Sequence, residues 1–210
     1  MWKKIILSAF TLITAFGILL ISAFRTASVK YEFNPSNPEE VTTVLGDNTE
    51  QIDYYLPYPG KVLPDSPFWS LKSVRDRLWL KVNTNPSREA ELYLLFADKR
   101  LGSSVILFEK DMDEAGLSTL TKAEKYLEEA HLKDIENRGM GYSSTDFLEK
   151  LAMASLKHYQ VTKYLLNIST DGVKPGIIKS QEYSKKVFEE VRNALLDKRI
   201  TPPENPFNWE

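Results

Sequence analysis

The chain has 210 residues, with 27 basic and 29 acidic side chains, two histidines and no cysteine, which gives a formal net charge of -2. This balance argues against a nucleic-acid partner, and the lack of cysteine excludes disulfides, thiolate metal sites and cysteine nucleophiles. Without the apolar N-terminal run, about 185 residues remain, which is enough for one domain with a sizeable core.

The most informative segment is residues 5–24, an uncharged apolar run that lies between a pair of lysines and Arg25. As a helix it would be roughly 30 Å long, which matches the hydrocarbon core of a bilayer. We therefore predict that residues 1–25 are a signal-anchor or transmembrane helix, with the N-terminus in the cytoplasm and the rest extracytoplasmic at the cell membrane. The alternative is a signal peptide cleaved after Ala23, which would give a secreted domain. An outward-facing domain without disulfides suits a bacterial envelope.

The next two segments contain proline but differ in their apolar content. Residues 26–52 have no sustained apolar period, so we predict a flexible spacer there. The segment that follows, up to Pro64, combines three prolines with tyrosine and leucine side chains. Its proline density excludes a helix, and its apolar side chains would be costly to leave in water. We therefore predict an ordered strap that lies on the helical domain.

Residues 53–200 are predicted to form an all-α bundle of about five helices. The sequence Asp65-Ser66-Pro67 predicts the start of the first helix and Asn85-Pro86 that of the second. Apolar residues recur in the first helix as a stripe at three- and four-residue spacing, which predicts a helix to about Val82. The members of that stripe are Phe68, Leu71, Val74, Leu78 and Val82.

The later helices follow the same rules. Gly116 is a possible break before a third helix, and a run of serine and threonine near residue 144 predicts the start of a fourth. Residues 171–176 contain glycine and proline and are predicted to be a loop, so the fifth helix is expected from about Ile178 to Arg199. Residues 201–210 are predicted to be a mobile polar tail.

Two motifs carry a family resemblance: Leu-Pro-Asp-Ser-Pro at residues 63–67, followed by Leu-Lys, and Asn-Pro-Ser-Arg-Glu-Ala-Glu-Leu at residues 85–92. The pattern resembles a bacterial envelope-associated domain family of unknown function, and residues 119–130 look like one of its later helices. The resemblance implies a membrane-anchored, extracytoplasmic helical protein; some relatives sit in anti-sigma-like proteins. It brings no enzymatic activity. Asn85 stands where the family usually has aspartate, a change that keeps the helix cap.

One constellation has metal-ligand spacing. Glu128, His131 and Asp134 would share one helical face, and a Glu-x-x-His pair occurs in di-iron bundles. The second such pair is missing, because Ser155 stands three residues before His158. The alternative is that His131 is a partly exposed histidine of an amphipathic helix, and that His158 is a hydrogen-bonded boundary residue. We expect no cofactor and no metal, and these three residues remain weak candidates.

Two further patterns allow a structural and a functional interpretation. Ala90-Glu91-x-Tyr93-Leu94-x-x-Ala97 recurs 33 residues later, close to the tetratricopeptide period, but it is also typical of a packed helical hairpin. The arginines at 75, 77, 88 and 100 are expected to pair with nearby acids and hold the first two helices in register. The alternative for these arginines is a site for a carboxylate or phosphate ligand.

No nucleophile motif or phosphate-binding glycine loop is present, so we expect the chain not to be an enzyme; an envelope hydrolase is the weakest alternative. The sequence predicts a non-enzymatic interaction, scaffolding or sensing module with an envelope protein as partner. Tyr58, Trp69 and Trp79 are the candidate interaction residues, with Trp79 expected to be exposed, because aromatic side chains are enriched in binding surfaces. The alternative is a metal- or small-ligand-binding sensor that uses Glu128, His131 and Asp134.

Overall fold

A computed structural model describes residues 2, 6–8, 10–18, 52–60, 62–83, 85–142, 145–207 and 209. These residues form helices and loops without a strand, so the all-α prediction is confirmed for the described chain. Residues 5, 9 and 19–24 of the apolar run, and residues 26–51 of the predicted spacer, lie outside the described residues. Within the described part, no helix combines the length and apolar character needed to cross a membrane.

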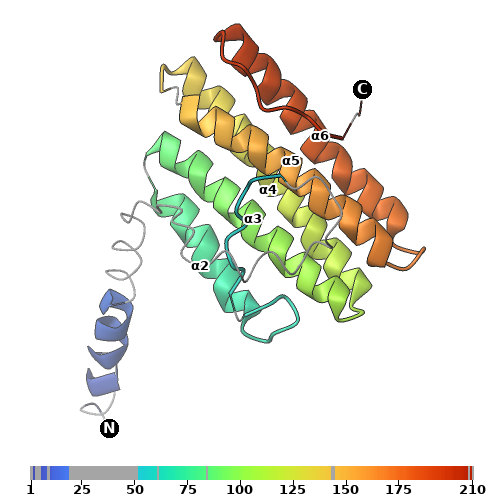
Figure 1. Cartoon of the computed structure of the whole chain (residues 1–210). Helices are drawn as coiled ribbons and strands as arrows, with labels where there is room; N and C mark the ends of the chain where they lie inside the picture. Colours follow the sequence, from blue (N-terminus) through green and yellow to red (C-terminus); the bar gives the residue numbers. More distant parts are fainter. Residues whose placement is uncertain are drawn as a thin grey trace.

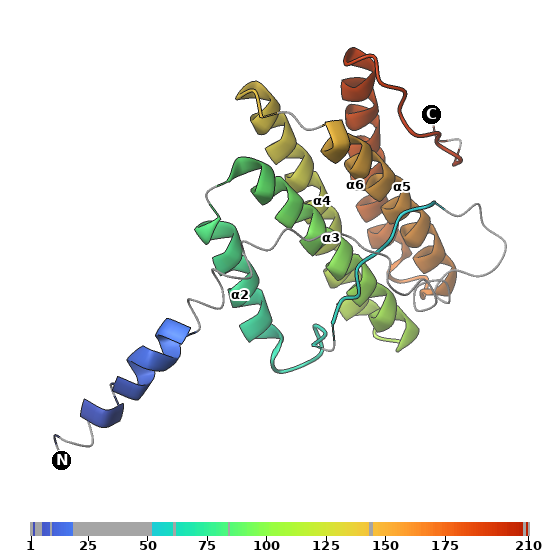
Figure 2. The same ribbon diagram turned by 60° about the vertical axis from the view of Figure 1, so that its left-hand side comes forward.

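Beyond residue 52, the described chain forms a bundle whose helices are α2 (Trp69–Val82), α3 (Pro86–Glu109), α4 (Asp113–Gly139), α5 (Thr145–Ile168) and α6 (Lys174–Asp197). The helices α3 and α4 form one hairpin and α5 and α6 form another, and the two hairpins pack together along their lengths (Figure 1). The helix α2 lies on the outer side of α3 and contacts no other helix of the bundle (Figure 2).

The observed start of α3 agrees with the predicted one, whereas those of α2 and α6 differ from the prediction. Asn85 caps α3 by accepting a hydrogen bond from the Arg88 amide (3.3 Å), and Pro86 fills the first helical position. The predicted start at Pro67 is wrong by two residues, because residues 64–68 form turns before α2 begins at Trp69. The predicted loop is also too long: α6 already begins at Lys174, with a proline in its first turn, where proline costs little.

The turn between α3 and α4 explains Gly116, which is an early residue of α4 rather than a break. A Cβ atom at this position would lie 2.8 Å from the Phe108 ring, which therefore packs against the first turn of α4. Asp111 adopts a left-handed conformation, with φ of 58°, in the reversal itself. The absence of a side chain at Gly116 thus lets the two helices approach closely.

The core consists of two apolar clusters separated by a polar layer. One cluster includes Leu94 of α3, Leu127 of α4 and Leu156 of α5. The other begins at Leu101 of α3 and at Val161 of α5 and continues through α4 to α6. Between the clusters, each of the three helices α3, α4 and α5 contributes one fully buried ionisable side chain: Asp98, Glu124 and His158.

The strap predicted between residue 52 and Pro64 is confirmed over residues 53–60, which cross the bundle from α5 over α3 to α2 (Figures 1 and 2). Ile52, which was assigned to the flexible spacer, is buried and belongs to the strap as well. Lys157 of α5 donates to the Ile52 carbonyl (3.3 Å) and the Tyr54 hydroxyl donates to Asp98 of α3 (2.8 Å). At the other end, Lys72 of α2 donates to the Pro59 carbonyl (2.8 Å). The strap therefore connects α2 to the body of the bundle.

The prediction of a mobile C-terminal tail is wrong for its described residues. The rings of Phe207 and Trp209 lie 4.8 Å and 4.0 Å from that of Tyr159 on α5, and Trp209 also contacts Phe188 of α6 edge-on (5.9 Å). The tail was predicted to be mobile because of its polar and proline residues. Its two aromatic residues anchor it, since burying such rings is strongly favourable.

Candidate functional site

The polar layer forms an ionic centre, defined here as Asp98, Glu124, His158 and Tyr54. His158 Nε2 lies 3.1 Å from Asp98 Oδ1, and His158 Nδ1 lies 2.9 Å from Glu124 Oε1. Because both ring nitrogens face carboxylate oxygens, both carry a proton and the ring is an imidazolium. The Tyr54 hydroxyl donates to the second oxygen of Asp98, which links the strap to the centre.

The electrostatics of the centre favour the charged histidine. Burial opposes the charge, but the attraction of Glu124 and the hydrogen bonds to both carboxylates outweigh it and raise the pKa of His158 to about 9. Burial and the Asp98 charge raise the pKa of Tyr54 well above its usual value, so it stays a donor. In the described chain, no hydrogen-bond donor reaches Glu124 Oε2. The centre therefore ties three helices and the strap together with charge-assisted hydrogen bonds.

The sequence pattern around His158 did not predict this centre. A hydrogen-bonded histidine at the boundary of the core was expected, whereas the ring is fully buried at the middle of the bundle. Its carboxylate partners come from other helices, 60 and 34 residues away. Two signals in the sequence were available for a polar layer. One was the Lys157-His158 pair beside an apolar face, and the other was Glu124 within the apolar stripe of α4.

The three weak metal candidates, Glu128, His131 and Asp134 of α4, each contact a different partner on α6 or in the last turn of α4. Glu128 accepts from Lys186 of α6 (2.9 Å), His131 Nε2 lies 2.7 Å from Glu190 of α6, and Asp134 accepts from Arg138 (2.8 Å). Among the described residues, no three histidine or acidic side chains are placed to hold a metal ion. The expectation of a partly exposed His131 is wrong: it is 2% exposed, and burial lowers its pKa.

Of the three candidate interaction residues, one is exposed on the strap and two are half-buried on α2. Tyr58 is exposed, as an interaction residue should be. The prediction of an exposed Trp79 is wrong, because it is half-buried with Arg75 over its ring (5.0 Å). Trp69 is half-buried as well, with Arg100 of α3 at 5.5 Å from its ring centre. Trp69 therefore links α2 to α3, whereas the cation over Trp79 comes from α2 itself.

The outward side of α2 carries four residues of the apolar stripe that predicted the first helix. We call this surface the α2 face; it consists of Phe68, just before the helix, and Leu71, Val74 and Leu78, which are 68%, 73%, 60% and 40% exposed. The predicted helix to Val82 is confirmed, and its stripe lies on the outer side. Trp69, Lys72, Asp76 and Trp79 occupy the inner side instead, at spacings of three, four and three residues.

Polar contacts explain why α2 is rotated in this way. Lys72 donates to the carbonyls of Pro59 (2.8 Å) and Val62 (3.0 Å), so its ammonium group holds the strap. Asp76, the one buried residue of α2, accepts from Arg75 (2.7 Å). The spacing of the two tryptophans, with a lysine and an aspartate between them on the same side, was the available signal for this orientation.

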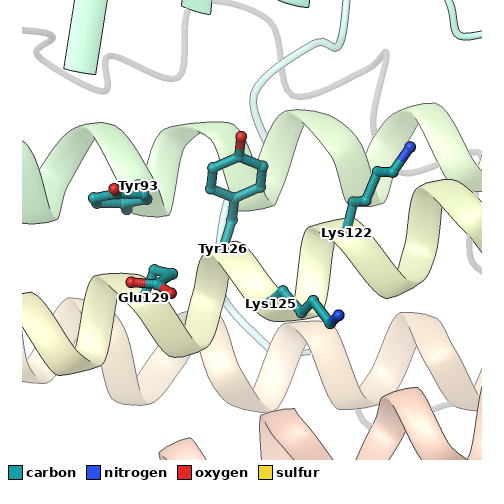
Figure 3. Close-up of a pocket in the computed structure, with 5 residues that line it drawn as sticks. All are labelled: Tyr93, Lys122, Lys125, Tyr126 and Glu129. Atoms are coloured by element: carbon teal, nitrogen blue, oxygen red, sulfur yellow. The ribbon is translucent and has the colours of Figure 1, made fainter. Parts of the chain in front are cut away.

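An open groove of about 340 Å³ lies on the α3–α4 hairpin, lined by Tyr93, Lys122, Lys125, Tyr126 and Glu129. Figure 3 shows that Tyr93 comes from α3 and the other four residues from α4. Tyr93 and Glu129 lie on one side of Tyr126 and the two lysines lie on the other. The two tyrosine rings, 5.8 Å apart, are the equivalent tyrosines of the 33-residue recurrence. The recurrence therefore reflects the packing of one hairpin, as in the second interpretation above.

The predicted arginine pairs are partly formed. Arg75 pairs with Asp76 and Arg88 with Glu91 (3.3 Å), both within a single helix. Arg100 instead lies over the ring of Tyr126 of α4 (4.6 Å), and Asp98 belongs to the ionic centre. The first two helices, α2 and α3, are held in register by Arg100, which also lies near the Trp69 ring of α2 (5.5 Å), and by the strap.

Comparison with known proteins gives one family. A family model described as a domain of unknown function (DUF5667) matches residues 61–198, which is more than half of the chain. No curated protein and no solved structure matches the chain.

Proposed function

We propose that this chain, which belongs to the DUF5667 family, is a non-enzymatic module held by a membrane anchor on the extracytoplasmic side of the cell membrane, where it docks through the α2 face. The observation that carries the proposal is the α2 face itself. Burying an apolar side chain of this size contributes roughly 1.5–3 kcal/mol. Three such side chains on α2, with Phe68 just before it, give a compact docking surface.

The α2 face cannot be covered by rotating α2 onto α3. Its inner side is occupied by the two half-buried tryptophans and by Lys72, which holds the strap through two carbonyls. Turning the helix would expose Asp76 together with both tryptophans and break these hydrogen bonds. A partner outside the bundle is therefore the simplest way to remove this surface from water.

Membrane anchoring is supported by the uncharged run of residues 5–24. Residues 10–18 are helical, and large apolar side chains such as Phe10, Ile13 and Phe16 are all more than half exposed. The hydroxyls of Thr11 and Thr14 donate to carbonyls one turn earlier in the same helix, so neither needs water. Such a surface suits a hydrocarbon solvent, and the preceding lysines favour a cytoplasmic N-terminus.

The non-enzymatic assignment is supported by the chemistry of the ionic centre. An imidazolium whose two nitrogens already donate to carboxylates cannot act as a general base. The three ionisable side chains of the polar layer have no exposed surface that a substrate could reach. The centre is suited to holding helices together.

Docking is tested by protection of a single thiol, since the natural chain has no cysteine. The full chain is expressed in its native cells with Leu71→Cys, or with Arg192→Cys on the exposed side of α6 as the matched control. We expect a membrane-impermeant maleimide to modify the first thiol several-fold more slowly than the second in native membranes. Equal rates would contradict docking at the α2 face.

Anchoring is tested separately on the same membranes. The full chain should stay in the pellet after alkaline extraction, and the control thiol should react in intact cells. Release into the supernatant would contradict the anchor, and reaction only after permeabilisation would contradict the orientation.

A further inference from the structure

We infer that the α2 face docks onto the membrane surface itself, with its apolar side chains at the acyl boundary and its flanking basic side chains on anionic lipid headgroups. This inference rests on the proposed function, because it names what covers the α2 face. A partner protein and a second copy of the chain are the other occupants, and the experiment below separates them from lipid.

The charge of α2 points to an anionic surface. The helix contains four basic residues and one acidic residue, whereas the whole chain has a formal net charge of -2. Its single acid, Asp76, is buried and already paired with Arg75. The basic groups of Arg77 and Lys81 are exposed beside the α2 face. Lys72 holds the strap and Arg75 pairs with Asp76, so Arg77 and Lys81 are the basic side chains of α2 that are left to attract anionic lipids.

The exposed apolar residues of α2 lie together on one side of the helix. Leu71, Val74 and Leu78 follow at spacings of three and four residues and form a narrow stripe on one side. Arg77 and Lys81 are exposed beside the stripe, where long basic side chains can reach headgroups while their stems cover apolar surface. With 14 residues, α2 is roughly 21 Å long, too short to cross a bilayer and suited to lie in its surface.

The chain that joins the apolar run to the strap limits how far α2 can move from the membrane, whatever the conformation of that chain. The apolar run ends at Phe24 and the strap begins at Ile52, so 27 residues separate them. Fully extended, these residues span at most roughly 95 Å. Tethering converts docking into an intramolecular event with a high effective concentration of lipid. A weak interfacial helix is therefore sufficient for stable contact.

The remaining exposed apolar residues of the bundle do not form a comparable stripe. Leu132 and Ile135 on α4, and Ile178 and Leu196 on α6, are exposed singly or in adjacent turns. Scattered residues of this kind are normal on a protein surface. In the described bundle, the combination of an apolar stripe with flanking basic groups is found on α2.

The test uses the purified full chain reconstituted into protein-free vesicles. An environment-sensitive fluorophore is attached at Leu71→Cys, with Arg192→Cys as the control position. Vesicles contain phosphatidylcholine alone or phosphatidylcholine with phosphatidylglycerol. We expect the label on α2 to shift to shorter wavelength and to be quenched by nitroxide lipids in the anionic vesicles, less so at high salt, and the control label to stay in water.

A charge-reversal pair sharpens the result. Arg77→Glu combined with Lys81→Glu should abolish the shift in anionic vesicles, while Arg192→Asp, which removes a distant positive charge, should leave it unchanged. Far-UV circular dichroism of each variant checks that the bundle is still folded. Retention of the shift after charge reversal would contradict recognition of anionic headgroups.

The outcomes distinguish this inference from the proposed function. If the α2 label stays in water in anionic vesicles, while Leu71→Cys is protected in native membranes, a protein occupant is established and the lipid inference is wrong. If the shift grows with the protein-to-lipid ratio and nitroxide lipids do not quench it, the occupant is a second copy. If the thiol is unprotected in native membranes too, the proposed function itself fails.

Discussion

The helices α2 and α4 carry similar apolar stripes but place them in different surroundings. In α4, Leu120, Ala123 and Leu127 are fully buried between α3, α5 and α6. In α2, Leu71 and Val74 face outwards, because tryptophans and two charged residues occupy the inner side. An apolar period therefore identifies a helix, but it does not say whether its stripe meets the core or a surface outside the domain.

The largest expected effect concerns the ionic centre of the body. His158→Ala leaves Asp98 and Glu124 as buried carboxylates without their counter-ion, which costs about 3–5 kcal/mol of unfolding free energy. Urea denaturation of the full chain in detergent measures the change. His131→Ala is the matched control, because its partner Glu190 is exposed and can turn to water. Equal losses for the two histidines would contradict a special role for the centre.

One substitution in α4 and one in α2 test whether the two apolar stripes differ in their contribution to stability. Leu127→Ala should lower the unfolding free energy by about 2–5 kcal/mol, because it leaves a cavity in the core. Leu71→Ala should change it by less than about 0.5 kcal/mol, since the side chain is exposed in the folded chain. The same denaturation experiment measures both. A large loss at Leu71 in detergent would mean that the stripe of α2 is part of the core after all.

The charge of His158 makes the stability of the helical bundle depend on pH. Its pKa rises from 6.5 in the unfolded chain to about 9 in the folded one, so its stabilisation is complete below pH 6.5 and is lost as the pH rises through 9. At roughly 1.4 kcal/mol per pH unit, the loss is about 3 kcal/mol. Denaturation midpoints across this pH window measure it, and a His158→Gln variant should lack the slope.

The smallest expected effect concerns the close approach of α3 and α4. Gly116→Ala places a methyl group against the Phe108 ring and should cost about 1–3 kcal/mol. Gly139→Ala, at the end of the same helix, meets no atom within 4 Å and should be neutral or slightly stabilising. Thermal unfolding of the two variants compares them. A neutral Gly116→Ala would show that the turn can relax.

Much of the fold could be predicted from local signals. Asn85-Pro86 predicted the start of α3, and the proline-rich segment predicted a strap, because both depend on neighbouring residues alone. The start of α6 was missed because Pro175-Gly176 reads as a loop, although proline is tolerated in a first turn. The tail was missed because two aromatic rings outweigh its polar residues.

The sites were less predictable, since they depend on contacts between distant segments. Asp98, Glu124 and His158 meet only because α3, α4 and α5 pack side by side, and a single sequence does not state which acid faces which base. The orientation of the α2 face was not predicted, for a related reason. Its apolar period is real, but the inner side is decided by Trp69 and by Lys72, which binds the strap.

The most direct test of the account is the rate at which an impermeant maleimide modifies Leu71→Cys in native membranes, relative to Arg192→Cys. A docked α2 face predicts a several-fold slower reaction at the first thiol, which disappears when the membranes are dissolved in detergent. Equal rates in intact native membranes would show that the α2 face is open to water, and would contradict the central claim.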